Sequence, residues 1–519
     1  MDIKTGDNKK TLTPEGATPG YFTEPLPRNN AIESAAADNH KPLKSPSEHT
    51  AVHVKNQIKQ KWGVDVDPEK TYLITFAYDK TTTPHKAVIT QKISLADAAR
   101  LNVQGTEKPG SMSFKHEARS TTPKTSFEIQ PYSPHDQKPK ADGTFDLPNV
   151  GIFNEYFQGI YTEPSPDSPN TYGTDQLLPI PPDDFKEMVL HHAYKKPYDE
   201  YLNFYWSHNN NREKYTKLNR IAYLKAAHTQ HHEQSLDEEG RKIAMRLTGV
   251  PPDQTYMEVD GSTLNKPYVP DPNLETKFLT FKGFSSTNIF YTRDTTTQKT
   301  LLYIPGNSSP IHTFDSPAAM NKWLANQLKD KDKAEAFKQH FSPRDYSSSL
   351  FSHGFDRQMN VFRQTIEAKG AVDFHEEQGH WQEGGIFGGE KVEGDPFKEM
   401  QKRTEKVMKN STSHQFVLNS DHTKNQVLGA TKILDAALLF LMPLGIAFPP
   451  IGVLLTGLSI TTGAIKTGIG IDDKVQDRPG GADRITFGLF NALKPIFTAG
   501  LGKAAPSIGG ALSKVILKP

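Results

Sequence analysis

The chain has 519 residues, of which 35% are hydrophobic, and a mean hydropathy of −0.62. This length allows about two to four domains, and the low hydropathy indicates that part of the chain is disordered. Lys and Arg number 61 against 60 Asp and Glu, a balance that argues against a dedicated nucleic-acid-binding protein. The absence of cysteine excludes disulfides, thiolate metal sites and cysteine nucleophiles.

Residues 1–50 are expected to form a disordered leader. They contain six prolines and only two aromatic residues, Tyr21 and Phe22, so they cannot bury enough apolar surface to fold alone. The first ten residues are polar and lack the apolar centre of a secretory signal peptide. Export would therefore need another route.

Residues 51–182 predict a small α/β region with a proline-rich connection. The segment VHVKNQIKQKWG predicts a short helix that ends at Gly63, and TYLITFAYD predicts a strand. ISLADAARLNV predicts a helix capped by Ser94. Residues 131–182 contain ten prolines interrupted by aromatic residues, which indicates an ordered, irregular connection.

Residues 183–345 predict a helical cluster followed by a β meander. In the segment YDEYLNFYW, the residues Tyr198, Leu202 and Tyr205 fall on one helical face, and later segments repeat this spacing. The period then changes to two, so TKFLTFKGF, TNIFYTRD and KTLLYIPGN predict three antiparallel strands. Ser316 is expected to cap a helix that follows them.

The last two regions differ sharply in polarity. Residues 346–426 are polar and predict a partly flexible region with a loop at Gly384 to Gly389. Residues 427–519 include thirty consecutive uncharged residues, 436–465, interrupted by Pro449 and Pro450. The two prolines predict a hairpin of two helices. Each half would be about 20 Å long, against a bilayer core of roughly 30 Å.

Two interpretations of this hairpin remain open. It is either the buried centre of a helical domain, or a hairpin sheltered in the soluble form that later moves into a membrane. Residues 427–519 have nine Lys and Arg and five Asp and Glu, a charge that favours an anionic surface. The residues expected to enter the membrane are Leu438, Leu439, Phe440, Pro449, Pro450, Leu454, Leu455 and Leu458.

These elements together predict an α+β fold that is mainly α-helical. It would consist of a helical bundle, a small antiparallel β meander and a C-terminal apolar helical hairpin. The predicted regions are 1–50, 51–182, 183–345, 346–426 and 427–519.

The order of several short segments resembles a known family. The segments are DVDP at residues 65–68, the aromatic helix that ends in Tyr205 and Trp206, KAAHTQHHEQSLDEEGRK, LLYIPG at 301–306, and FDS before Trp323. In this order they resemble the N-terminal region of bacterial dermonecrotic-toxin-like proteins, of the kind found in pseudomonads. The resemblance covers about residues 50 to 505 and includes the apolar hairpin. It implies a role in binding a target cell or crossing its membrane, and it implies no catalytic residues.

No catalytic, cofactor-binding or metal-binding residues are predicted. His375 and His380 are five residues apart, whereas a zincin helix needs two histidines four apart. His228, His231 and His232 have the spacing of one helical face, but their polar neighbours indicate a solvated surface.

Two other patterns are also interpreted as structural. The glycines of residues 384–389 lack the lysine and hydroxyl residue of a phosphate-binding loop. Ser352, His353 and Asp356 lie close in the sequence, but no nucleophile elbow frames the serine. The segment from Tyr303 to Gly306 is expected to be a strand followed by a turn.

The leading hypothesis is a secreted, non-catalytic bacterial virulence or insecticidal toxin component that engages a target cell and its membrane. Its partners would be the target-cell membrane or a receptor, with a separate toxin subunit or a secretion chaperone as further candidates, and it would need no cofactor. One alternative is an effector delivered into host or rival cells by a dedicated secretion system. Another is an interaction module without a membrane role.

Overall fold

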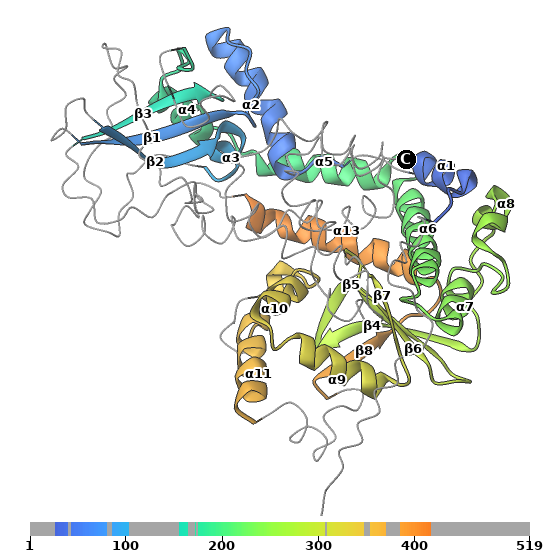
Figure 1. The fold of residues 1–519 in the computed structure, drawn as a ribbon. Helices are drawn as coiled ribbons and strands as arrows, with labels where there is room; N and C mark the ends of the chain where they lie inside the picture. The colour runs from blue at the N-terminus through green and yellow to red at the C-terminus, as the bar shows by residue number, and fades with distance from the viewer. Residues whose placement is uncertain are drawn as a thin grey trace, which may run out of the picture.

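The computed structural model describes residues 26–39, 43–79, 86–102, 155–163, 172, 175–306, 309–346, 353–369 and 385–416. These residues form helices and two antiparallel sheets, so the expected α+β class is confirmed. Figure 1 shows the three-stranded sheet at one end of the molecule and the five-stranded sheet at the other, with helices α5 and α13 between them.

The three-stranded sheet has the strand order β2-β1-β3. Leu73 of β1 lies opposite Ile160 of β3, and both are fully buried. The predicted strand at residues 71–79 and the helix capped by Ser94 are confirmed. The elements of this part are α2 (Pro46–Trp62), β1 (Thr71–Asp79), β2 (Lys86–Ser94), α3 (Leu95–Arg100), β3 (Glu155–Thr162) and α4 (Pro182–Leu190).

A helical cluster follows, as predicted. Its helices are α5 (Lys195–Ser207), α6 (Asn211–His232), α7 (Glu238–Leu247), the 3-10 turn η1 (Tyr256–Glu258) and α8 (Gly261–Asn265). Tyr198, Leu202, Tyr205 and Trp206 of α5 are all buried, which confirms the predicted face. The turn after α7 passes through Gly249 at φ +74°, a conformation that glycine adopts without strain.

The five-stranded sheet has the strand order β7-β6-β5-β4-β8. The predicted meander is confirmed and has a fourth strand. Its strands are β4 (Leu274–Phe281), β5 (Phe284–Asp294), β6 (Thr300–Tyr303) and β7 (Ile311–Phe314). Helix α9 (Pro317–Gln327) begins after its Ser316 cap, as expected, and is followed by α10 (Lys331–Lys338) and the 3-10 turn η2 (Pro343–Asp345).

Residues 388 and 389 correct the prediction of a flexible glycine loop. Both belong to strand β8 (Phe387–Lys391), which pairs with β4. A Cβ atom at Gly389 would lie 2.3 Å from the Tyr291 hydroxyl and 2.6 Å from the Lys277 Cβ. Glycine is therefore required at this position by close packing across the sheet.

The polar region of residues 346–426 is also more ordered than expected. It contains α11 (Phe355–Lys369), β8 and the helix α13 (Pro396–Gln415). Phe355 and Phe362 of α11 pack on Phe281, with ring centres 5.3 and 5.5 Å apart. In this polar region, a few buried apolar side chains on each element are sufficient to fix that element in the part of the fold around the five-stranded sheet.

The expected disordered leader is contradicted for residues 26–39 and 43–50. Residues 30–39 form α1 (Asn30–Asn39), which packs on α6 and buries Ile32 and Ala36. The Asn29 amide donates hydrogen bonds to the carbonyls of Tyr256, at 2.6 Å, and Val259, at 2.8 Å. These distant partners offset the ordering cost that the local composition alone cannot offset.

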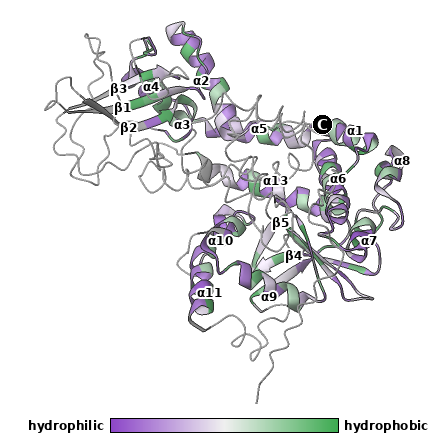
Figure 2. Cartoon of the chain, viewed as in Figure 1, coloured by the Kyte–Doolittle hydropathy of each residue, from purple (hydrophilic) through white to green (hydrophobic). Residues whose placement is uncertain are grey.

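The larger hydrophobic cluster of the described residues includes members from the parts around both sheets. Trp206, Phe185 and Phe281 are among its fully buried large side chains. Figure 2 shows polar residues along much of α11 and apolar residues in β4, as expected for an outer helix and an inner strand.

The apolar hairpin predicted within residues 427–519 lies outside the described residues. Among the residues that are described, no helix is both long enough and apolar enough to cross a membrane.

Candidate functional site

The eight residues expected to enter a membrane, Leu438 to Leu458, lie outside the described part of the chain. The described part of the chain ends before these residues, at Phe416. Helix α13 ends at Gln415, and Phe416 is the last described residue, 20 positions before the uncharged stretch starts at Ala436. Phe416 packs where α2 meets α5.

We call this meeting point the histidine junction. It consists of His49 and His53 on α2, Tyr198 and Tyr201 on α5, and Phe416 after α13. Residues four apart lie on the same face of a helix, so His53 lies beside His49, whose ring contacts α5.

The aromatic rings of the junction contact one another closely. The ring centre of His49 lies 4.8 Å from that of His53, 5.5 Å from that of Tyr198 and 5.0 Å from that of Tyr201. The Tyr198 ring also lies 5.5 Å from that of Phe416. Tyr198 therefore contacts both His49 of α2 and Phe416 at the end of α13.

Hydrogen bonds between neutral groups hold α2 beside α5. The backbone N–H of Lys44 donates to the Tyr201 hydroxyl at 2.8 Å, and the Tyr198 hydroxyl donates to the Lys44 carbonyl at 3.2 Å. Further along, the Tyr194 hydroxyl donates to the Gln57 side chain at 2.7 Å. None of these three bonds requires a charged side chain.

The electrostatics of the junction favour a neutral His49. Burial lowers its pKa to about 4, and the positive charges of His53 and Lys44 add to the effect. The His49 Nδ1 atom is buried and has no hydrogen-bond partner. The pKa of His53 is also lowered, by burial and by Lys44.

The one carboxylate of this segment, Glu48, has another role. It accepts a hydrogen bond from the Ser45 backbone at 2.8 Å, while the Ser45 hydroxyl accepts one from the Glu48 backbone at 3.1 Å. This capping box starts α2. Burial raises the Glu48 pKa, although its hydrogen bonds with Ser45 act against this effect.

Helix α13 is fixed at points before it reaches the junction. Arg212 of α6 makes two hydrogen bonds to the Glu405 carboxylate, at 2.7 and 2.8 Å. The Arg403 guanidinium lies 4.2 Å from the centre of the Phe278 ring and bonds the Glu390 carboxylate of β8 at 2.9 Å. The body of α13 is therefore fixed to the five-stranded sheet, and its end is in the histidine junction.

The structure changes the interpretation of one histidine group. His228 is 5% exposed and packs on Tyr256, so the prediction of a solvated histidine face is wrong for this residue. His231 is partly exposed and lies 3.3 Å from Glu238. The described residues contain no group of three or more side chains suited to hold a metal ion.

The other sequence patterns do not form a reactive group. Asp356 pairs with Lys338 at 3.0 Å, and His353 is exposed. Ser352, His375 and His380 lie outside the described residues. Tyr303 ends β6 as expected, and Gly306 adopts φ +92° in the turn after it.

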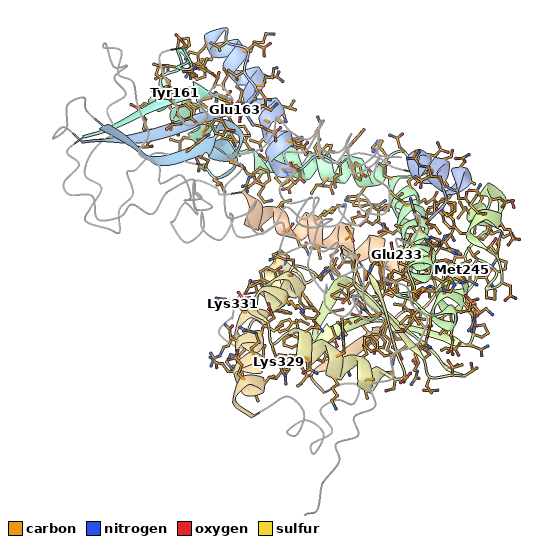
Figure 3. The ribbon with its side chains drawn as sticks, viewed as in Figure 1. Tyr161, Glu163, Glu233, Met245, Lys329 and Lys331 are labelled. Carbon is orange, nitrogen blue, oxygen red and sulfur yellow. The ribbon has the colours of Figure 1, made fainter. Side chains whose placement is uncertain are left out.

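Charged side chains are distributed over separate parts of the molecule. Figure 3 shows Glu163 by the three-stranded sheet, Glu233 near α6 and α7, and Lys329 and Lys331 near α10.

The sequence interpretation missed His49 because it started the helix at Val52 and assigned earlier residues to the leader; His53 lay within the predicted helix, but no role was assigned to it. A signal was present. Ser45, Pro46 and Glu48 have the spacing of a capping box with proline in the first turn, which marks a helix start.

Comparison with known proteins supplies one match. Residues 151–344, just over a third of the chain, match the family model described as dermonecrotic toxin, N-terminal domain. The matched region runs from β3 through the helical cluster and the meander to η2. No curated protein matches the chain.

Proposed function

Because residues 151–344 match the N-terminal domain of dermonecrotic toxins, we propose that the chain is a toxin component that engages a target cell and its membrane. The role is binding or translocation rather than catalysis. The family match is the observation that carries this proposal, and the uncharged stretch of residues 436–465 supports its membrane part.

The proposed membrane segment comprises Leu438, Leu439, Phe440, Pro449, Pro450, Leu454, Leu455 and Leu458. Each half of this hairpin, at about 20 Å, is shorter than a bilayer core of roughly 30 Å. Insertion would therefore involve several copies or a tilted, partial insertion. The excess of Lys and Arg after residue 427 supports a preference for anionic lipid.

The proposed partners are a target-cell membrane or receptor, and a separate toxin subunit or a secretion chaperone. The proposed location is outside the producing cell, at a target membrane. Both are part of the proposal, and the match to a toxin domain supports the location.

The experiment is release of an encapsulated dye from anionic and from neutral liposomes by the full chain. The test variant is Leu455→Asp, which places a charge in the proposed membrane segment. The matched control is Val361→Asp, because Val361 is 53% exposed on α11 and an added charge there meets water. We expect the unchanged protein and the control to release dye from anionic liposomes, and Leu455→Asp to remain folded without doing so.

Two outcomes would contradict the proposal. Equal dye release by the unchanged protein and Leu455→Asp would show that the segment has no membrane role. Loss of folding in Leu455→Asp, with no dye release by the unchanged protein, would favour a buried core hairpin.

A further inference from the structure

We propose that the histidine junction is a proton-operated contact, in which protonation of His49 separates α2 from α5. The proposal adds regulation to the membrane role proposed above and rests on that role for its biological purpose. The contact itself is argued from the described residues alone.

The first argument is the surroundings of the His49 ring. It packs against His53 on its own helix and against Tyr198 and Tyr201 of α5. Its Nδ1 atom is buried without a partner. A second proton on the ring would create a cation with a buried N–H group that has no acceptor, which is a costly state.

The second argument is the set of charges that face the ring. Helix α2 contributes Glu48 and His53, and Lys44 lies two residues before this helix. Helix α5 contributes the hydroxyls of Tyr198 and Tyr201. From the segment after α13 comes Phe416, which carries no charge. Lys44 and a protonated His53 would both repel an imidazolium.

Protonation of Glu48 has the opposite effect on the junction from protonation of His49. Its carboxylate is bonded to Ser45 in the capping box rather than to His49. Because burial raises its pKa, protonation of Glu48 is easier in the closed state and favours a closed junction. The lowered pKa of His53 adds to the effect of His49.

The third argument concerns what is released. The hydrogen bonds between α5 and the α2 segment include those of Lys44 with Tyr198 and Tyr201, and of Gln57 with Tyr194. A hydrogen bond between neutral groups contributes modestly to stability, so a buried cation at His49 opposes these bonds effectively. Opening removes His49 from the Tyr198 ring on which Phe416 packs, and so weakens the contact at the end of α13.

The size of the effect follows from proton linkage. His49 has a pKa of about 4 in the closed junction, against an ordinary value of 6.5 when the ring is free in water. Between pH 7.5 and pH 5 this difference shifts the equilibrium toward the open form by up to about 30-fold. Because the ring is only half buried, solvent screening reduces the shift, and we expect about 10- to 30-fold.

The test uses the absence of cysteine in the natural chain, so that one introduced thiol is the only reactive one. Thr50 is fully buried on α2 and lies on the same helical face as Pro46, His53 and Gln57. Val52 is 45% exposed on the same helix. The rate at which a pyridyl disulfide labels Thr50→Cys, divided by the rate for Val52→Cys, measures opening at each pH.

The same measurement is made in the full chain carrying His49→Phe, which keeps an aromatic ring but cannot bind a proton. His49→Gln replaces it if the phenylalanine variant does not fold. Ala244→Cys on α7, where the alanine is fully buried, reports on unfolding of the remainder of the molecule.

We expect the labelling ratio at Thr50 to rise about 10- to 30-fold from pH 7.5 to pH 5 with His49 present, and less than about 3-fold without it. Ala244 should show no difference between the two backgrounds. An equal rise with and without His49, no rise with His49, or a rise at Ala244 that depends on His49 in the same way would each overturn the proposal. No lipid is present, so this result is independent of the dye-release experiment.

Discussion

At the scale of single residues, Gly389 shows how close packing restricts a side chain. A Cβ atom there would lie 2.3 Å from the Tyr291 hydroxyl. We expect Gly389→Ala to lower the free energy of unfolding by about 1–3 kcal/mol, because β8 must move away from β5 and β4. Chemical denaturation measures this change.

Gly261 provides the control for this prediction. A Cβ atom at Gly261 meets nothing within 4 Å, and the residue has no positive φ. Gly261→Ala should therefore change stability by no more than about 1 kcal/mol, and in the stabilising direction. A similar loss in both variants would contradict the packing argument.

Gln230 is a buried side chain that pairs with the backbone of an edge strand. Its amide nitrogen donates to the Ile311 carbonyl at 2.8 Å, and its oxygen accepts from the Ile311 N–H at 2.9 Å. Gln230→Leu leaves both backbone groups of Ile311 without these partners. We expect a loss of about 1–3 kcal/mol for each unsatisfied group, measured by thermal or chemical unfolding.

The exposed Gln60 of α2 is the matched control, because it is a glutamine whose loss exposes no buried group. Gln60→Leu should change stability by less than about 0.5 kcal/mol. If Gln230→Leu were equally mild, the side-chain pairing with β7 would not contribute to the sheet.

At the scale of elements, Arg403 links α13 to the five-stranded sheet. Its guanidinium donates to the Ser285 hydroxyl at 2.6 Å and to the Ser286 carbonyl at 3.2 Å, in addition to its contacts with Glu390 and Phe278. Arg403→Met should lower the stability of the fold by about 1–3 kcal/mol, because it removes several hydrogen bonds and one cation–π contact.

Lys402 is the neighbouring control on the same helix. Its side chain is 62% exposed and pairs only loosely with Glu399, at 3.5 Å. Lys402→Met should shift stability by less than about 0.5 kcal/mol in urea unfolding. Comparable losses in both variants would show that helix propensity, rather than the contacts of Arg403, controls the docking of α13.

The elements that could be predicted were those with a strong local pattern. The aromatic stripe of α5 includes Tyr198 and Leu202 at helical spacing, and β1 matches its nine predicted residues. Local start and stop signals also worked at Ser94, Ser316 and Gly63, because a cap is determined by neighbouring residues.

The missed elements depend on partners far away in the sequence. Strand β8 has the sequence FGGEK, whose glycines and charges oppose a strand, and it exists because β4 pairs with it more than 100 residues earlier. The buried face of α13 includes Gln401, Thr404 and Ser411, so its helical period is hidden by polar residues. The helix that carries His49 had a local start signal at Ser45, but its contact with α5 depends on residues about 150 positions away.

At the scale of the whole molecule, buried histidines make the fold sensitive to acid. His228 and His312 have pKa values lowered to about 4, and that of His340 is lowered to about 3, in each case mainly by burial. All three are at most 5% exposed. Their neutral form is therefore the form that the folded state requires.

The direction of the pH effect follows from these lowered values. The unfolded chain takes up protons on these histidines below about pH 6.5, whereas the folded chain does so only near pH 4. The contribution of these histidines to the free energy of unfolding is therefore complete above about pH 6.5 and falls as the pH decreases. Each histidine contributes a slope of about 1.4 kcal/mol per pH unit between those limits. Denaturation at several pH values measures the sum.

A variant pair separates this effect from general acid denaturation. His312→Gln removes one buried titrating group and should reduce the slope by about one proton. His191→Gln should not change it, because the His191 side chain is 69% exposed. A slope that is the same in the two variants and in the unchanged protein would contradict the assignment.

The packing of α1 on α6 also has a consequence for synthesis on the ribosome. Residues 30–39 are translated first, but α6 ends at His232 and the acceptor carbonyls of Asn29 belong to Tyr256 and Val259. At roughly 5–20 residues per second, α1 waits about 10–45 s for these partners to be made. During that time Ile32 and Ala36 are exposed to the cytoplasm, and a nascent chain arrested before Val259 would present them to chaperones and proteases.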